Sequence, residues 1–106
     1  MEVVVDMGEE PATVALVEPA DCGRFHVAVR GGGDAGTLDR ALRSDEVGSV
    51  DGDGEAIVRV EAVRRLARGA VGETWDADFA AMLAYARSKG WLSDDGSSIR
   101  AHVEWG

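Results

Sequence analysis

The segment from residue 74 to residue 105 constrains the fold more than any other part of the chain, because it marks both ends of a helix. Acidic residues stand in the expected first turn, basic residues in the last turn and a glycine after them, in the order Thr74, Asp76, Asp78, Arg87, Lys89 and Gly90. Acid near the positive end of the helix dipole and base near its negative end both stabilise a helix. Threonine is a good N-cap, and glycine permits the positive φ of a helix end. We therefore expect a helix between Thr74 and Gly90.

Apolar spacing supports this helix and adds a strand after it. Bulky or apolar residues recur at three- and four-residue intervals and form one helix face, made of Phe79, Met82, Leu83 and Ala86. Closer to the end of the chain, apolar residues alternate with polar ones at Ile99, Ala101, Val103 and Trp105. This alternation predicts a single strand over 99–105 with one buried side.

The first thirty residues contain three short β-rich segments, 2–7, 12–18 and 24–30. Their short connections favour an antiparallel meander, because successive parallel strands need a crossover of a dozen or more residues. A short helix capped by Thr37, a strand at 56–60 and a helix at 61–68 are expected to follow. The acidic, glycine-rich segment 44–55 is predicted to be a mobile loop.

This order of elements predicts an α+β fold in a single domain, residues 1–106. We expect a two-layer sandwich in which a mostly antiparallel sheet of four to five strands carries two to three helices packed on one face. A chain of 106 residues is long enough to bury a stable core without disulfide bonds.

Charge and composition limit the partners. The formal net charge of −9 argues against nucleic acid and membranes, because an acidic surface repels phosphate backbones and anionic lipid. No apolar run has the length that a bilayer requires, and the first residues show no signal-peptide pattern. Cys22 is the only cysteine, so no internal disulfide can form, which fits a cytoplasmic protein.

Two glycine-rich segments match binding motifs only in part. Residues 31–36 fit the spacing G-x-G-x-x-G, which lets a backbone approach a pyrophosphate. Asp34 places negative charge where phosphate would lie, so a flexible connection is the better interpretation. Residues 51–55 suggest a calcium loop, but with Gly54 in the sixth position the twelfth is Val60, where a glutamate is needed. We predict no cofactor and no metal site.

The two histidines and the cysteine are the other candidates for chemistry. His26 and His102 each lie on the polar side of an expected strand, and they approach each other if those strands are neighbours. Such a pair can contact a ligand, whereas exposed sheet residues are the plainer interpretation. Cys22 precedes His26 by four residues, and a small turn or core cysteine is favoured over a thiolate–imidazole pair. We therefore predict no catalytic residue.

The expected helix also carries a stripe of small side chains opposite its bulky face, at Ala77, Ala80, Ala81, Ala84 and Ser88. Small residues let a second helix or sheet approach closely, including the same helix of a twin subunit. Alanine is also the best helix former and is tolerated on any helix face. The stripe therefore favours a homodimer without requiring one.

Three segments of the second half carry a family resemblance: 63–69, the aromatic spacing from Trp75 to Trp91, and the closing 99–105. Together they resemble the C-terminal half of short, acidic, uncharacterised proteins of high-GC bacteria. The resemblance implies no activity, ligand or site.

Two functions remain open from the sequence. The preferred hypothesis is a small, non-catalytic cytoplasmic domain that acts by self-association or by binding another protein. The alternative is a small-ligand or metal-binding protein, or a minor enzyme, with an aromatic pocket and a histidine contact. The candidate ligand-binding residues of the alternative are His102, His26, Trp75, Trp91 and Tyr85, and the pocket is expected to include Phe25 and Trp105.

Overall fold

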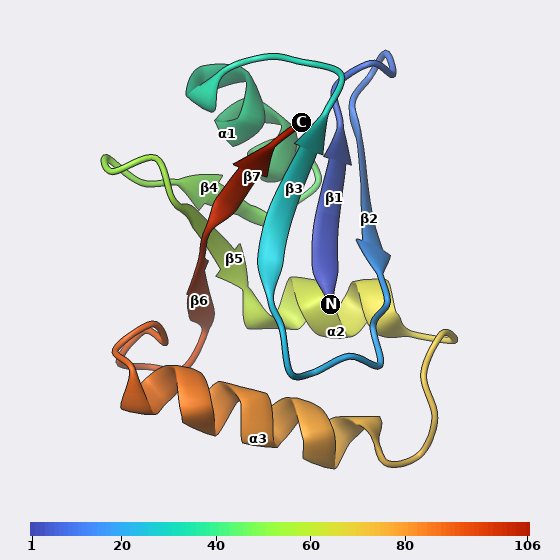
Figure 1. Cartoon of the computed structure of the whole chain (residues 1–106), viewed down its shortest axis with the longest axis vertical. Helices are drawn as coiled ribbons and strands as arrows, with labels where there is room; N and C mark the ends of the chain where they lie inside the picture. The colour runs from blue at the N-terminus through green and yellow to red at the C-terminus, as the bar shows by residue number, and fades with distance from the viewer.

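The computed structural model describes residues 1–106, and its strands form two separate sheets (Figure 1). The four-stranded sheet has the order β2-β1-β3-β7, from β1 (Glu2–Asp6), β2 (Thr13–Val17), β3 (His26–Arg30) and β7 (Val103–Trp105). The three-stranded sheet is antiparallel and consists of β4 (Gly48–Val50), β5 (Ala56–Arg59) and β6 (Ser98–Ala101). The helices are α1 (Ala35–Ser44), α2 (Val60–Ala67) and α3 (Trp75–Ser88). The α+β class is confirmed.

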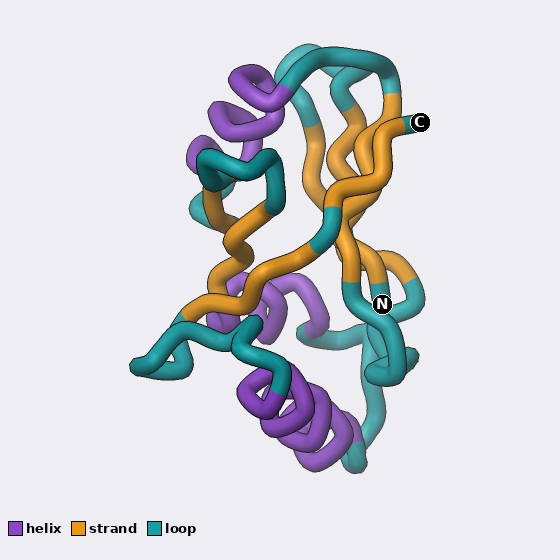
Figure 2. Tube along the Cα trace, turned by 60° about the vertical axis from the view of Figure 1, so that its left-hand side comes forward, coloured by secondary structure: helices purple, strands orange, loops and turns teal.

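The two sheets and the helices enclose one apolar core. Figure 2 shows α1 and the three-stranded sheet on one side of the four-stranded sheet, with α3 at the lower end of both. Alternate residues of β1 and β3 point into this core, and Val3, Val5 and Val27 have no exposed surface. All 21 buried residues are hydrophobic, so the fold is stabilised mainly by the removal of apolar surface from water. None of the helices is long and apolar enough to cross a bilayer.

The first three strands do not form the expected meander. β2 is antiparallel to β1, but β3 lies on the other side of β1 and is parallel to it. Val17 and His26 both pair with Glu2, so β2 ends and β3 begins beside the start of β1. The connection 18–25 has only to pass the end of one strand, a distance of about 10 Å. No helical crossover is needed, because β2 has already returned the chain to the end where β1 begins.

The strand predicted over 99–105 is divided between the two sheets. β6 pairs with β5, the backbone then bends at His102, and β7 pairs in parallel with β3. The carbonyl of His102 accepts a hydrogen bond from the Val27 amide at 2.9 Å, which ties the crossing point to β3. The alternation predicted for the apolar side chains survives as far as Val103, whereas Trp105 is 49% exposed.

Residues 44–55 are ordered by local contacts, in contrast to the expected mobile loop. They contain the end of α1, the strand β4 and Val47, which is fully buried. The turn that joins β4 to β5 is closed by the Asp51 side chain, whose Oδ1 accepts hydrogen bonds from the amides of Asp53 and Glu55 at 2.9 and 3.0 Å. The acidic residues of this segment thus build a hairpin turn.

The helix ends follow the predicted chemistry only in part. The N-cap of α1 is Asp34, whose side chain accepts from the Thr37 amide while the Thr37 hydroxyl accepts from the Asp34 amide. These hydrogen bonds hold the pKa of Asp34 below its usual value. Thr37 is therefore the second half of a capping box and not the cap itself. At α3, Thr74 occupies the N-cap position without a side-chain hydrogen bond, and Gly90 ends the helix region with a φ of +77°.

Candidate functional site

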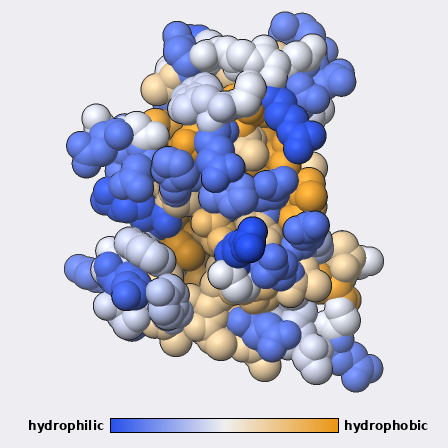
Figure 3. Space-filling view, viewed as in Figure 1, coloured by the Kyte–Doolittle hydropathy of each residue, from blue (hydrophilic) through white to orange (hydrophobic).

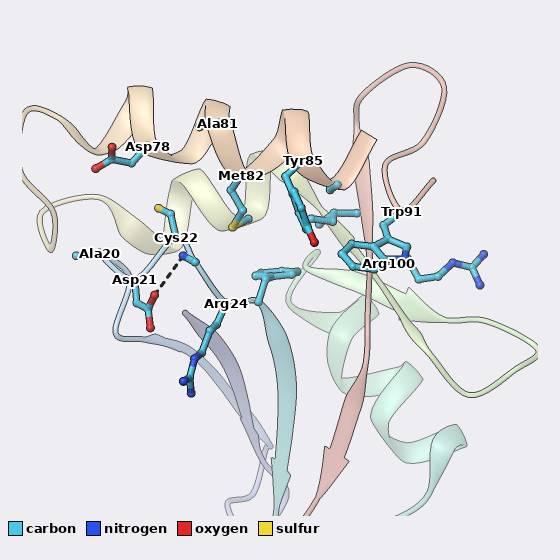
Figure 4. A pocket seen from close by; sticks show the side chains of 14 residues that line it. Ala20, Asp21, Cys22, Arg24, Asp78, Ala81, Met82, Tyr85, Trp91 and Arg100 are labelled. Atoms are coloured by element: carbon cyan, nitrogen blue, oxygen red, sulfur yellow. Dashed lines mark hydrogen bonds between the residues drawn. The ribbon is translucent and has the colours of Figure 1, made fainter. Parts of the chain in front are cut away.

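A cleft of about 640 Å³ lies between α3 and the loop that joins β2 to β3 (Figure 4). The loop contributes residues 20–25, α3 contributes one side from Asp78 to Ala86, and the last wall comes from Trp91 and β6. The apolar part of the lining consists mainly of Cys22, Phe25, Met82, Tyr85, Trp91 and Ile99. The volume falls in the range typical of small-molecule sites.

The aromatic end of the cleft is positioned by the turn that follows α3. Gly90 has a φ of +77°, which turns the chain so that the Trp91 amide donates to the Ala86 carbonyl at 2.9 Å. The Trp91 ring then meets the Tyr85 ring edge to face, with centroids 5.9 Å apart and an interplanar angle of 67°. Both rings are exposed, Tyr85 by 58% and Trp91 by 45%. Large aromatic surface thus remains open to a ligand.

The other end of the cleft is charged. Asp21, Arg24 and Asp78 lie at this end, away from Tyr85 and Trp91 (Figure 4). Asp21 uses Oδ1 to accept a hydrogen bond from the Gly23 amide at 3.1 Å, and its Oδ2 is 4.0 Å from the Met1 ammonium group. The side chains of Arg24 and Asp78 form no ion pair or hydrogen bond within the chain.

Arg100 also borders the cleft, but other residues already compensate its charge. Its guanidinium lies 3.1 Å from the Asp51 carboxylate and 3.3 Å from that of Glu55. The acidic hairpin that partly matches a calcium loop is thus bound by an arginine of β6. A backbone hydrogen bond holds Arg100 beside Trp91, because the Arg100 amide donates to the Trp91 carbonyl at 2.7 Å.

Cys22 is the only thiol of the chain and lies on the cleft wall. Partial burial raises the pKa of the Cys22 thiol, and the negative charge of Asp78 raises it further. The thiol therefore stays protonated at neutral pH, and a protonated thiol is a weak nucleophile. In this position Cys22 contributes apolar, polarisable surface.

The structure places two of the five candidate ligand-binding residues in the cleft, Tyr85 and Trp91, together with the predicted Phe25. Trp75 instead belongs to the core: it is 6% exposed and stacks on Phe79 with ring centroids 4.7 Å apart. Its indole Nε1 donates to the Pro19 carbonyl at 2.7 Å, so Trp75 anchors the loop that forms the cleft wall.

The two histidines lie outside the cleft, on the polar face of the four-stranded sheet. His26 is the first residue of β3, and His102 lies directly before β7, the strand that pairs with β3. The imidazole Nε2 of His26 lies 2.8 Å from the Glu2 carboxylate and 3.5 Å from that of Glu104. His102 is exposed and takes part in no side-chain hydrogen bond or ion pair. No group of three or more His, Cys, Asp and Glu side chains is arranged to hold a metal ion.

Several cleft residues were not among the sequence candidates, notably Arg24, Asp78 and Met82. Their sequence positions gave no sign of the cleft, because its two main walls, the β2–β3 loop and α3, are more than fifty residues apart in the sequence. Comparison with protein-family models, curated proteins and solved structures finds no match to this chain.

Proposed function

We propose that this chain is a cytoplasmic binding protein that holds a small organic molecule with a ring system in the cleft between α3 and the β2–β3 loop. The observation that carries the proposal is the convergence of Phe25, Tyr85 and Trp91 from three separate segments on a cavity of about 640 Å³. Rings held by a backbone turn and a helix lose little conformational entropy on binding, so a flat apolar ligand is favoured.

Binding is better supported than catalysis by the groups that surround the cavity. The Cys22 thiol has a raised pKa and remains protonated. Neither histidine, the residue type that most often serves as a general base near neutral pH, lines the cleft. The cleft thus offers surfaces and fixed charges, with no nucleophile activated by an adjacent base.

A substitution that fills the cleft tests this proposal. We expect Ala81→Trp to weaken the binding of a neutral solvatochromic dye at least about tenfold, because the new side chain occupies the apolar volume. Ala80→Trp is the matched control, since Ala80 is exposed on the same helix but does not line the cleft. Dye fluorescence and circular dichroism would be recorded for both variants. Equal dye affinity in the two variants would contradict the proposal.

Self-association through α3 is the second candidate, because the predicted stripe of small side chains is exposed along the whole helix. Ala77, Ala80, Ala81, Ala84 and Ser88 are all accessible to solvent, and Figure 3 shows mildly hydrophobic surface along α3 between hydrophilic residues.

If this helix face joins two subunits, Ala84→Arg converts a dimer into a monomer in native mass spectrometry, because a long charged side chain prevents close helix approach. Ala84 does not line the cleft, so dye binding serves as the control and stays unchanged. A mass that is the same for wild type and Ala84→Arg rules out this interface. The same spectra show any small molecule retained from purification as a fixed excess mass.

A further inference from the structure

The strand β2 forms an outer edge of the four-stranded sheet (Figure 1). The Met7 amide donates a hydrogen bond to β3 at 2.7 Å, so alternate residues of β1 turn their backbone groups toward β3 and those between, such as Val4, toward β2. Val4 pairs with Ala15, so Ala15 turns toward β1, and its neighbours Val14 and Leu16 turn outward. No other backbone group of the chain forms a hydrogen bond with these outward amides and carbonyls.

The other three edges of the two sheets are protected. At β4, the Val50 amide donates to the Asp39 carboxylate at 2.8 Å. At β6, the Arg100 amide donates to the Trp91 carbonyl at 2.7 Å. The edge strand β7 has only three residues, and the middle one is the charged Glu104. Short length, charge and bound backbone groups keep edge strands from pairing with other chains, and β2, with five uncharged residues, shows none of them.

We infer that β2 is an interface for a second copy of this chain, and that two β2 strands pair antiparallel about a two-fold axis at Ala15. Val14 of one copy then lies opposite Leu16 of the other, and each such pair exchanges two backbone hydrogen bonds. The contact is symmetric, so the outward donors of each copy meet the outward acceptors of the other. It joins two four-stranded sheets into one continuous sheet.

The side chains of β2 permit this alignment. Ala15 meets its own copy at the axis, where the side chains of a non-hydrogen-bonded pair come closest, and alanine is small enough for this contact. On the same exposed face, Thr13 meets Val17 of the second copy. The net charge of the chain is −9, but no residue of β2 is charged, so the alignment places no two carboxylates opposite each other within the strands. The edge is therefore complementary to itself.

Amide hydrogen exchange tests the pairing at the atoms concerned. The Val14 and Leu16 amides contact water in the monomer and are hydrogen-bonded in the dimer. We therefore expect their exchange to slow at least about threefold when the protein concentration is raised from roughly 20 to 500 µM. The Trp105 amide is the control, because it faces away from β3 at the opposite edge of the sheet and keeps its rate.

Three variants test the position of the interface by sedimentation equilibrium. Ala15→Lys sets two ammonium groups opposite each other at the axis and is expected to raise the dimer Kd about fivefold or more. Ala28→Lys is the matched control and keeps the wild-type Kd, because Ala28 lies in the same row of the same sheet face but two strands from the edge. Val14→Pro removes an outward amide without breaking the β1–β2 ladder and is expected to raise the Kd at least about tenfold. Circular dichroism checks that each variant is folded.

Three results would overturn the inference. One is a wild-type chain that stays monomeric at about 500 µM. Another is an equal dimer Kd for Ala15→Lys and Ala28→Lys. The third is a dimer that is lost in Ala84→Arg but kept in Val14→Pro and Ala15→Lys, which would place the interface on α3. The inference does not depend on the proposed function, because no residue of β2 lines the cleft.

Discussion

Phe79→Ala is expected to lower the free energy of unfolding by about 3–5 kcal/mol, the range for deleting a fully buried aromatic ring. Phe79 has no exposed surface, stacks on Trp75 and lies under the Arg64 guanidinium, which is 5.0 Å from the ring centroid. The ring therefore connects α3 to α2 as well as to the core. For a domain of this size the loss corresponds to a fall of more than about 10 °C in the midpoint of thermal unfolding.

Tyr85→Ala is the matched control for this prediction, because Tyr85 lies on the same helix but is 58% exposed. Tyr85→Ala is expected to lower the free energy of unfolding by less than about 1 kcal/mol, although it removes one wall of the cleft. Urea or thermal unfolding followed by circular dichroism measures both variants. Similar losses for Phe79→Ala and Tyr85→Ala would mean that α3 does not pack as described.

Gly31→Ala is expected to destabilise the chain by roughly 2–4 kcal/mol, from a positive φ and a backbone clash together. Gly31 has a φ of +84°, and a Cβ at this position would overlap the Gly8 amide nitrogen and approach the Gly8 Cα to 2.9 Å. The clash is with backbone atoms, so a change of side-chain rotamer cannot relieve it. The β1–β2 turn and the β3–α1 connection would have to separate.

Gly32→Ala isolates the contribution of the clash, because Gly32 has nearly the same φ, +86°, but open space where its Cβ would lie. We expect Gly32→Ala to lower the free energy of unfolding by about 1 kcal/mol, from the left-handed conformation alone. Chemical denaturation of the two variants gives the comparison. If Gly32→Ala costs as much as Gly31→Ala, the close approach of Gly8 and Gly31 is absent in solution.

These glycines also explain the sequence motif G-x-G-x-x-G in structural terms. Gly31 is required by its contact with Gly8, and Asp34 caps α1 through its hydrogen bond with Thr37. The motif therefore belongs to a connection between a strand and a capped helix, as the sequence favoured, but this connection packs closely against Gly8 in place of the flexible one expected. Spacing alone could not show this, because the residue that excludes a side chain at Gly31 lies twenty-three positions earlier.

Elements with strong local signals were predicted well. The predicted bounds of the second helix, 61–68, differ by one residue from those of α2, and the main helix is confirmed between Thr74 and Gly90. Its charge order and its 3.6-residue period act within a few turns, so they can be read without tertiary contacts. The first three strands were likewise found within about two residues at each end.

Properties that depend on long-range pairing could not be predicted in the same way. Nothing local shows that β3 passes to the far side of β1, because a short connection fits either arrangement once β2 has returned the chain to its starting end. The division of the last strand at His102 is equally invisible, since apolar alternation continues through it. Trp75 illustrates the same limit at the site: its spacing fits a pocket, but its partners Phe79 and Pro19 place it in the core.

The three tryptophans provide the most direct test of the ring-binding cleft. Each indole N–H gives its own signal in a two-dimensional ¹H–¹⁵N spectrum, and the three lie in different places: Trp91 in the cleft, Trp75 in the core and Trp105 at the end of β7. Titration with benzyl alcohol is predicted to move the Trp91 signal in a saturable way and to leave those of Trp75 and Trp105 in place. A Trp91 signal that stays fixed throughout the titration would contradict the proposed cleft.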